Sequence, residues 1–106
     1  MEPSEWVYAA KLDAVSEEVP ISVQIEGVAV GVYKINGTLH AIEDICPHAD
    51  ALLSEGFIDG EYVECPLHGA LFHIPTGKCT RGPATRDVLP FDTRIEDKKI
   101  YLRKHS

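Results

Sequence analysis

The sequence predicts a single all-β domain, and three observations carry that prediction. Apolar and β-branched residues gather in short runs such as "PISVQI" and "VAVGVYKI". Glycine-containing turn pairs separate such runs, at Glu26-Gly27, Asn36-Gly37 and Asp59-Gly60. At 106 residues, the chain is long enough for one compact domain with a modest core and too short for a second. We therefore treat residues 1–106 as one domain.

The first half of the chain is expected to form a meander of antiparallel strands. Trp6 and Val7 begin an N-terminal strand. Residues 19–43 then supply three strands, because Asn36-Gly37 is a strong two-residue hairpin signal between "VAVGVYKI" and "TLHAI".

The second half combines loops with two further hairpins. Asp59-Gly60 is a hairpin signal, and "ADALLSEG" before it has room for one helical turn. Near the C-terminus, apolar and charged residues alternate in "FDTRIE", and "KIYLR" follows after a polar turn, which predicts a closing hairpin. We expect a β scaffold at about residues 1–43 and 84–106, with a small subdomain inserted at about residues 44–83.

The formal charge of −7 is concentrated in one stretch of the sequence. No Lys or Arg occurs between Lys34 and Lys78. Seven acidic residues occupy that stretch, namely Glu43, Asp44, Asp50, Glu55, Asp59, Glu61 and Glu64. Nucleic acid is therefore an unfavourable partner, because a phosphate backbone requires a basic surface. The acidic stretch either serves solubility or steers a basic partner protein.

The chain is expected to be cytoplasmic and unanchored. Its N-terminus, "MEPSEWVYAA", has neither the basic nor the apolar region of a signal peptide, and no run approaches the roughly 18 apolar residues of a membrane span. Three cysteines are an odd number, which argues against a disulfide framework and for metal or redox use in a reducing compartment.

Two cysteines and two histidines form short mixed pairs. Cys46 and His48 make a Cys-x-His pair, Cys65 and His68 make a Cys-x-x-His pair, and sixteen residues separate His48 from Cys65. Two Cys and two His suit a tetrahedral zinc ion that staples the loops. A [2Fe–2S] cluster with two thiolates on one iron and two imidazoles on the other needs one ligand of each kind from each loop. The observed pairing satisfies that demand.

"CPH" and "CPLHG" resemble the two ligand boxes of the Rieske iron–sulfur proteins. The resemblance spans the chain, and "GFIDGEYVECPLHGALFHIPTGK" is similar to the core of the soluble Rieske ferredoxins that serve bacterial aromatic-ring-hydroxylating dioxygenases. It implies an antiparallel β sandwich or barrel that carries one Rieske-type [2Fe–2S] cluster. By this resemblance Cys46 and Cys65 hold the inner iron, and His48 and His68 hold the outer iron near the tip of the protein.

The resemblance also implies that the chain is an electron-transfer component and not itself an enzyme. It would receive single electrons from an NAD(P)H-dependent flavoprotein reductase and pass them to a terminal ring-hydroxylating oxygenase. The charge distribution, independently of the resemblance, predicts that these partners dock at an acidic cluster tip. A shuttle that meets two partners in turn is expected to be a monomer. Two alternatives remain: a small Rieske subunit of another redox complex, such as a nitrite reductase, and a zinc-stapled interaction module.

Departures from the high-potential Rieske proteins predict a low reduction potential. The positions that carry Ser and Tyr hydroxyl donors in that group correspond here to Ala70 and Phe72, and the extra cysteines of its disulfide correspond to Ala51 and Leu67. Without those hydrogen bonds the sulfurs stay more electron-rich, which disfavours reduction. We expect a potential of about −150 mV rather than about +300 mV.

Other residues of ligand type lie outside both boxes. Cys79 is expected to be a thiol with no ligand role. His73 is expected to be an ordinary strand residue, since the second box already has its pair, and His40 belongs to no recognisable constellation. Gly69 and Gly77 are expected to adopt positive backbone angles in the cluster loops.

Overall fold

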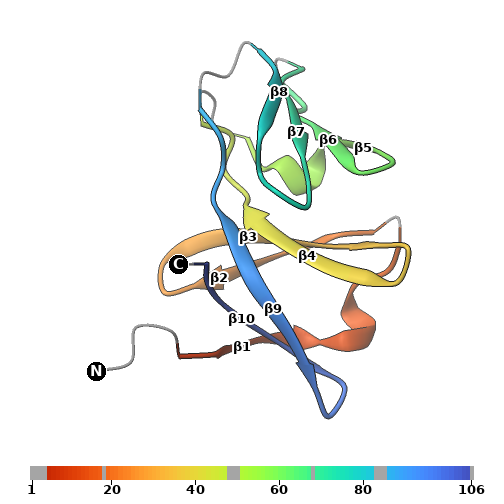
Figure 1. The fold of residues 1–106 in the computed structure, drawn as a ribbon, viewed down its shortest axis with the longest axis vertical. Coiled ribbons are helices and arrows are strands. Elements are labelled where there is room, and N and C mark those ends of the chain that lie inside the picture. Colours follow the sequence, from red (N-terminus) through yellow and green to blue (C-terminus); the bar gives the residue numbers. More distant parts are fainter. Residues whose placement is uncertain (1–4, 18, 48–50, 68, 83–85, 106) are drawn as a thin grey trace.

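The computed structural model describes residues 5–17, 19–47, 51–67, 69–82 and 86–105. Two antiparallel sheets make up this part of the chain (Figure 1), which confirms the all-β prediction. The larger sheet has six strands in the order β1-β10-β9-β4-β3-β2, and the smaller has four in the order β5-β6-β7-β8.

The larger sheet consists of β1 (Val7–Lys11), β2 (Ile21–Ile25), β3 (Val28–Ile35), β4 (Thr38–Glu43), β9 (Pro90–Glu96) and β10 (Lys99–Lys104). The smaller sheet consists of β5 (Phe57–Asp59), β6 (Tyr62–Glu64), β7 (Leu71–His73) and β8 (Cys79–Arg81). Two short 3-10 turns, η1 (Leu12–Ala14) and η2 (Leu53–Glu55), complete the elements. The helical turn predicted within "ADALLSEG" is η2. No helix in the described part of the chain is long and apolar enough to cross a bilayer.

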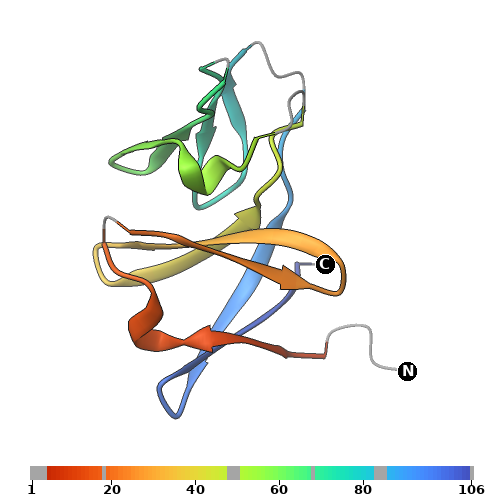
Figure 2. The same cartoon turned by 180° about the vertical axis from the view of Figure 1, so that it is seen from behind.

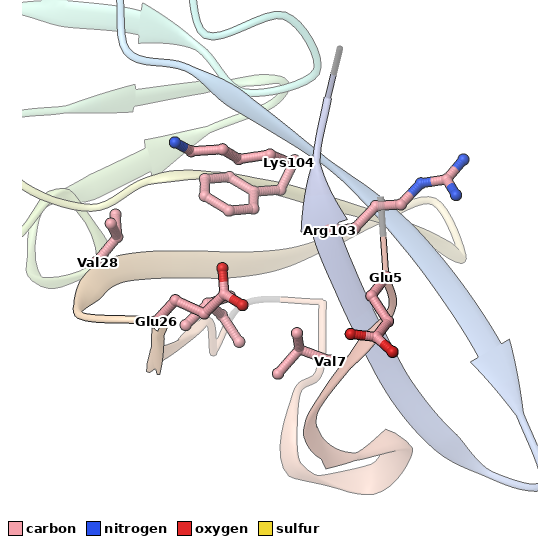
Figure 3. Close-up of a pocket in the computed structure, with 8 residues that line it drawn as sticks. Glu5, Val7, Glu26, Val28, Arg103 and Lys104 are labelled. Carbon is pink, nitrogen blue, oxygen red and sulfur yellow. The ribbon is translucent and has the colours of Figure 1, made fainter. Parts of the chain in front are cut away.

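The six-stranded sheet curls until its edge strands β1 and β2 come close together, which nearly closes a barrel (Figures 1 and 2). A cavity of about 260 Å³ opens near these edges (Figure 3). It is lined by Glu5, Val7, Ile25, Glu26, Val28, Phe91, Arg103 and Lys104. This opening belongs to the scaffold and contains neither of the cysteines that follow β4 and β6.

Strand β3 is buried on both faces, as its continuous run of apolar residues predicts. Val30 and Val32 face a core enclosed by the six-stranded sheet. Tyr33 faces a second core, which it shares with Ile42 of β4 and with residues of the small sheet. Because side chains alternate along a strand, one strand contributes to both cores.

Left-handed residues form the predicted hairpin turn between β3 and β4. Asn36 and Gly37 have φ values of 51° and 81°, as a two-residue turn with two left-handed positions requires. The carboxylate of Glu17 accepts hydrogen bonds from both of their backbone N–H groups, at 2.8 and 2.7 Å. The side chain of Glu17, which is distant in sequence, therefore stabilises this turn.

Backbone hydrogen bonds join the small sheet to the scaffold. Beyond β4, the N–H of Leu53 donates to the carbonyl of Asp44 at 2.7 Å, which returns the chain alongside the scaffold. On the way back to β9, the N–H of Val88 donates to the carbonyl of Gly77 at 2.9 Å. The small sheet is thus tied at both the segment that enters it and the segment that leaves it.

The closing hairpin predicted from "FDTRIE" and "KIYLR" forms as β9 and β10, and only part of β9 is buried. Phe91 is buried at 7% exposure, whereas Ile95 is 50% exposed. The reason is that β4 pairs with only the first two residues of β9, and the remainder of β9 pairs with β10 alone. Ile95 therefore lies at the exposed end of the β9–β10 hairpin.

Two glycines with similar backbone angles provide a test of the packing at the small sheet. Gly77 has φ +78° and a Cβ there would overlap the carbonyl of Val88, whereas Gly37 has φ +81° with open space around it. We expect Gly37→Ala to lower the free energy of unfolding by about 1 kcal/mol through backbone strain alone. Gly77→Ala is expected to cost about 3 kcal/mol, because the overlap adds to that strain. Equal urea-unfolding midpoints for the two variants would contradict this packing.

Candidate metal centre

The first cysteine of the paired motifs lies in a loop closed by backbone contacts. Cys46 follows β4 by three residues and is 2% exposed. Its N–H donates to the carbonyl of Ala51 at 3.0 Å, and Ile45 forms an isolated β-bridge with Leu52. His48, which was predicted as a ligand from this loop, lies outside the described residues.

The second cysteine lies in a tighter loop between β6 and β7. Cys65 is 1% exposed, and its N–H donates to the carbonyl of Ala70 at 2.8 Å. The N–H of Gly69 donates to the carbonyl of Cys65 at 3.1 Å, and the φ of +75° at Gly69 confirms the predicted left-handed position. His68, the other predicted imidazole ligand, lies outside the described residues.

The two cysteines share one apolar core. Cys46 and Cys65 pack in the same buried cluster as Leu53, Val63 and Phe72. Thiolates are the ligands that iron–sulfur clusters require, and an apolar shell around them limits solvent access. This half of the site therefore fits a cluster that takes one thiolate from each loop. Within the described ranges, which exclude both histidines of the motifs, no group of three or more His, Cys, Asp or Glu residues could hold a metal.

The core around the cysteines supplies no hydroxyl at the two positions singled out from the sequence. Ala70 and Phe72 are both completely buried. Neither side chain can donate a hydrogen bond to a sulfur. Their burial places apolar atoms at both positions.

A buried carboxylate anchors the first cysteine loop to the scaffold. Asp44 is 0% exposed, and its carboxylate accepts hydrogen bonds from the backbone N–H and the hydroxyl of Ser54, at 2.8 and 2.7 Å. The hydroxyl of Ser22, on β2, is a further partner. Gly31 makes room for this network, because a Cβ there would lie 2.8 Å from an Asp44 oxygen. The carboxylate of Asp44 thus connects β2, the first cysteine loop and η2.

Burial governs the ionisation of this group and of its neighbour. Burial raises the pKa of the Asp44 carboxyl, while the hydrogen bonds from Ser54 and Ser22 act in the opposite direction. Burial also raises the pKa of the Tyr33 hydroxyl, and the nearby Asp44 adds to that shift. The Tyr33 hydroxyl is buried and has no hydrogen-bond partner within the described part of the chain.

One of the seven residues of the acidic stretch packs inside the protein, and others have partners at the surface. Asp44 is buried and structural. Glu43 accepts a hydrogen bond from the N–H of Leu89 at 2.8 Å, and Glu61 lies 3.0 Å from His73. Asp50 lies outside the described residues. The sequence count missed this division because it cannot distinguish a carboxylate that packs internally from one that faces water.

His73 lies in strand β7, as predicted. Its Nδ1 lies 2.9 Å from the hydroxyl of Thr76, and its Nε2 faces Glu61. His40, on β4, interacts electrostatically with both Glu61 and His73, and burial is the main reason that its pKa is lowered. Sequence reasoning missed this grouping of three side chains because they come from separate elements.

Cys79 lies apart from both ligand boxes, on β8. Its Sγ lies 3.5 Å from the carbonyl of Arg81, and its backbone N–H donates to the carboxylate of Asp87 at 2.8 Å. It is half-buried and packs against the core that contains the other two cysteines. That it has no ligand role stays a prediction.

The fold and the site define a small β protein with a nearly closed barrel and with a buried cysteine from each of two loops gathered in one core. The model of the Rieske [2Fe-2S] domain matches residues 5–94, and the chain belongs to that family. One Rieske-type [2Fe–2S] cluster is therefore its cofactor.

Curated and structural relatives agree with this family. The ferredoxin component of the naphthalene 1,2-dioxygenase/salicylate 5-hydroxylase systems of Ralstonia sp. is 34% identical over 98 residues, which cover 92% of this chain and 94% of that protein. The ferredoxin of carbazole 1,9a-dioxygenase from Nocardioides aromaticivorans IC177 is 31% identical with a TM-score of 0.88, covering 96% of this chain and all of that one.

A further structural relative is solved as an assembly. It is the complex of reduced oxygenase and oxidised ferredoxin in carbazole 1,9a-dioxygenase, at 29% identity and a TM-score of 0.86, covering 95% of this chain and 96% of that one. Two putative nitrite reductase small subunits, at 24% and 19% identity, share the fold alone.

Asp44 offers a test of how the first cysteine loop is anchored. Asp44→Asn is expected to lower the free energy of unfolding by about 2 kcal/mol, because one amide oxygen cannot accept the hydrogen bonds that Ser54 and Ser22 donate to two carboxylate oxygens. Asp59→Asn, at the exposed end of β5, is the matched control and should change stability by less than about 0.5 kcal/mol. Urea unfolding followed by circular dichroism measures both. Similar values for the two variants would refute the anchoring role.

Proposed function

We propose that this chain is a one-electron carrier that passes electrons to a terminal ring-hydroxylating oxygenase. The observation that carries the proposal is the likeness, over nearly the full length of both chains, to ferredoxin components of dioxygenase systems. The source of the electrons is, in this proposal, an NAD(P)H-dependent flavoprotein reductase. The chain itself performs no substrate chemistry, in keeping with relatives that are named as electron-carrying components.

We propose Cys46, His48, Cys65 and His68 as the four cluster ligands. The burial of both cysteines in one core and the closure of their loops support the thiolate half of this set. The sequence pairing of each cysteine with a histidine supports the imidazole half. Two ferric ions, two sulfides and two thiolates sum to zero charge, so reduction leaves a single negative charge on the cluster.

We propose that partners dock on the face that carries the two cysteine loops. Ile45 and Leu67, which adjoin the proposed ligands in sequence, are 48% and 58% exposed. Exposed apolar side chains suit the centre of a transient interface, with polar groups around it. Glu64, beside Cys65, can contribute electrostatic steering at the edge of this face. The docking surface is thus more apolar at its centre than the acidic tip predicted from the sequence.

We also propose that the protein works as a monomer in the cytoplasm. The odd number of cysteines and the use of thiols as ligands suit a reducing compartment. A carrier that serves two partners through one face cannot hold that face in a permanent interface. Sedimentation of the cluster-bearing protein at micromolar concentration tests the monomer.

The carrier function is tested by reconstitution with the purified reductase and oxygenase of the Ralstonia naphthalene dioxygenase system. The reduced protein is mixed rapidly with the oxygenase. The cluster spectrum of the oxygenase should bleach as it is reduced, while the spectrum of the oxidised carrier develops, with one electron transferred per chain. Turnover of the complete mixture should depend on this chain. A cluster-bearing protein that neither accepts electrons from the reductase nor passes them to the oxygenase would contradict the proposal.

The reduction potential provides a second prediction. We expect about −150 mV at neutral pH, since Ala70 and Phe72 offer no hydroxyl donor to the sulfurs. The potential should fall at alkaline pH, because metal-bound imidazoles then lose protons and the oxidised state is stabilised. A redox titration against pH measures both features. A value well above zero, or a potential independent of pH, would be inconsistent with the proposed ligands and their surroundings.

The docking face is tested by removing an apolar contact without changing charge. Leu67→Gln should slow electron transfer to the oxygenase by about tenfold, while the cluster spectrum stays unchanged. Ile95→Gln is the matched control, because Ile95 is 50% exposed on the β9–β10 hairpin, at the opposite end of the molecule from the small sheet (Figure 1). Equal slowing by both variants would place docking elsewhere.

A further inference from the structure

Arg81, on strand β8, contacts the second cysteine loop through its side chain. Its Nη2 and Nε both donate hydrogen bonds to the carbonyl oxygen of Gly69, at 3.0 and 3.3 Å. Gly69 directly follows His68 in the sequence, and its own N–H is bonded to the carbonyl of Cys65. Arg81 therefore holds the loop at the residue next to a proposed ligand.

A carboxylate completes the arrangement around this loop. Glu64 pairs with Leu71, and Leu71 pairs with Arg81, so the three residues form a row across β6, β7 and β8. Nη2 of Arg81 lies 3.6 Å from Oε1 of Glu64. The other oxygen of Glu64 would lie 3.3 Å from a Cβ on Gly69. The loop is therefore bordered by one cation and one anion, which have opposite effects on a nearby redox centre.

Arg81 brings a positive charge to a part of the protein whose own sequence has none. No Lys or Arg occurs between Lys34 and Lys78, and both ligand boxes lie within that stretch. Arg81 comes twelve residues after Gly69 and reaches back to it through the pairing of β7 with β8. A basic side chain is thereby placed at a loop that has none of its own.

We propose that Arg81 is a positioning residue of the iron–sulfur centre, which fixes the second ligand loop and raises the reduction potential of the cluster. The inference rests on the ligand set given under the proposed function. Reduction adds a negative charge, so a neighbouring cation stabilises the reduced state and a neighbouring carboxylate disfavours it. The side chains of Arg81 and Glu64 are 57% and 39% exposed, so salt should weaken both effects.

Four single substitutions separate the charge of Arg81 from its hydrogen bonds. Arg81→Gln removes the charge, and Arg81→Lys keeps the charge but loses the two donors that converge on one carbonyl oxygen. Glu64→Gln removes the opposing charge. Arg94→Gln is the matched control, because Arg94 is an exposed strand arginine whose Nη2 also lies 3.6 Å from a carboxylate, that of Glu96.

The expected results differ for each variant. In redox titrations at low ionic strength, Arg81→Gln should shift the potential downward, Glu64→Gln should shift it upward, and Arg94→Gln should leave it unchanged. Both shifts should shrink as salt is added. Arg81→Lys should keep a potential nearer to that of the unaltered protein but lose its visible absorbance about tenfold faster in the presence of an iron chelator.

Either half of the inference can be overturned separately. An Arg81→Gln protein with full iron content and an unaltered potential would refute the electrostatic role. An Arg81→Lys protein that bleaches no faster than Arg94→Gln would refute the positioning role. If Arg81→Gln holds no cluster, Arg81→Lys and Glu64→Gln decide the two halves between them. Failure of the ligand set itself is distinguishable, because the unaltered protein would then contain no iron–sulfur cluster or would show the spectrum of a cluster bound by cysteines alone.

Discussion

The burial of strand β3 on both faces is the constraint on which the rest of the structure depends. Val30 and Val32 fill the core of the scaffold, and Tyr33 helps to fill the core that contains the two cysteines. Because successive side chains alternate, a one-residue slip of β3 would exchange the two faces and disrupt both cores. The position of the small sheet is thus set by the same register that forms the barrel.

The connection from this strand to the cluster loops is polar. Asp44 directly follows β4 and is completely buried, and burial of a carboxylate is unfavourable unless its oxygens are hydrogen-bonded. Ser54 and Ser22 satisfy that requirement from η2 and β2. Hydrogen bonds have directions, so this network specifies where the first cysteine loop begins more narrowly than apolar packing alone. At the second loop, Arg81 supplies a comparable directional contact at the surface.

Local sequence signals predicted the parts of the structure that local chemistry determines. Asn36-Gly37 forms the predicted turn because glycine and asparagine tolerate left-handed angles, and Gly69 and Gly77 adopt positive φ values for the same reason. The alternating pattern in "FDTRIE" predicted the β9–β10 hairpin but not the exposure of Ile95, since it contains no information about where a neighbouring strand ends.

Contacts between residues distant in sequence could not be predicted from one chain. Asp44 was counted with the surface acids because its serine partners come from separate elements. The contact of Arg81 with Gly69 depends on how β8 pairs with β7, which no local pattern specifies. The cysteines of the candidate centre were identified from their spacing and residue types, whereas the polar groups that position their loops required the structure.

We propose that two loops of this β protein supply a mixed set of thiolate and imidazole ligands to a single [2Fe–2S] cluster. A low-temperature electron paramagnetic resonance spectrum of the dithionite-reduced protein, with iron and zinc measured on the same sample, tests this ligand set most directly. We expect a rhombic signal with the low average g value of a cluster bound by Cys and His, and two irons per chain. A silent sample that contains zinc, or the spectrum of a cluster bound by cysteines alone, would contradict it.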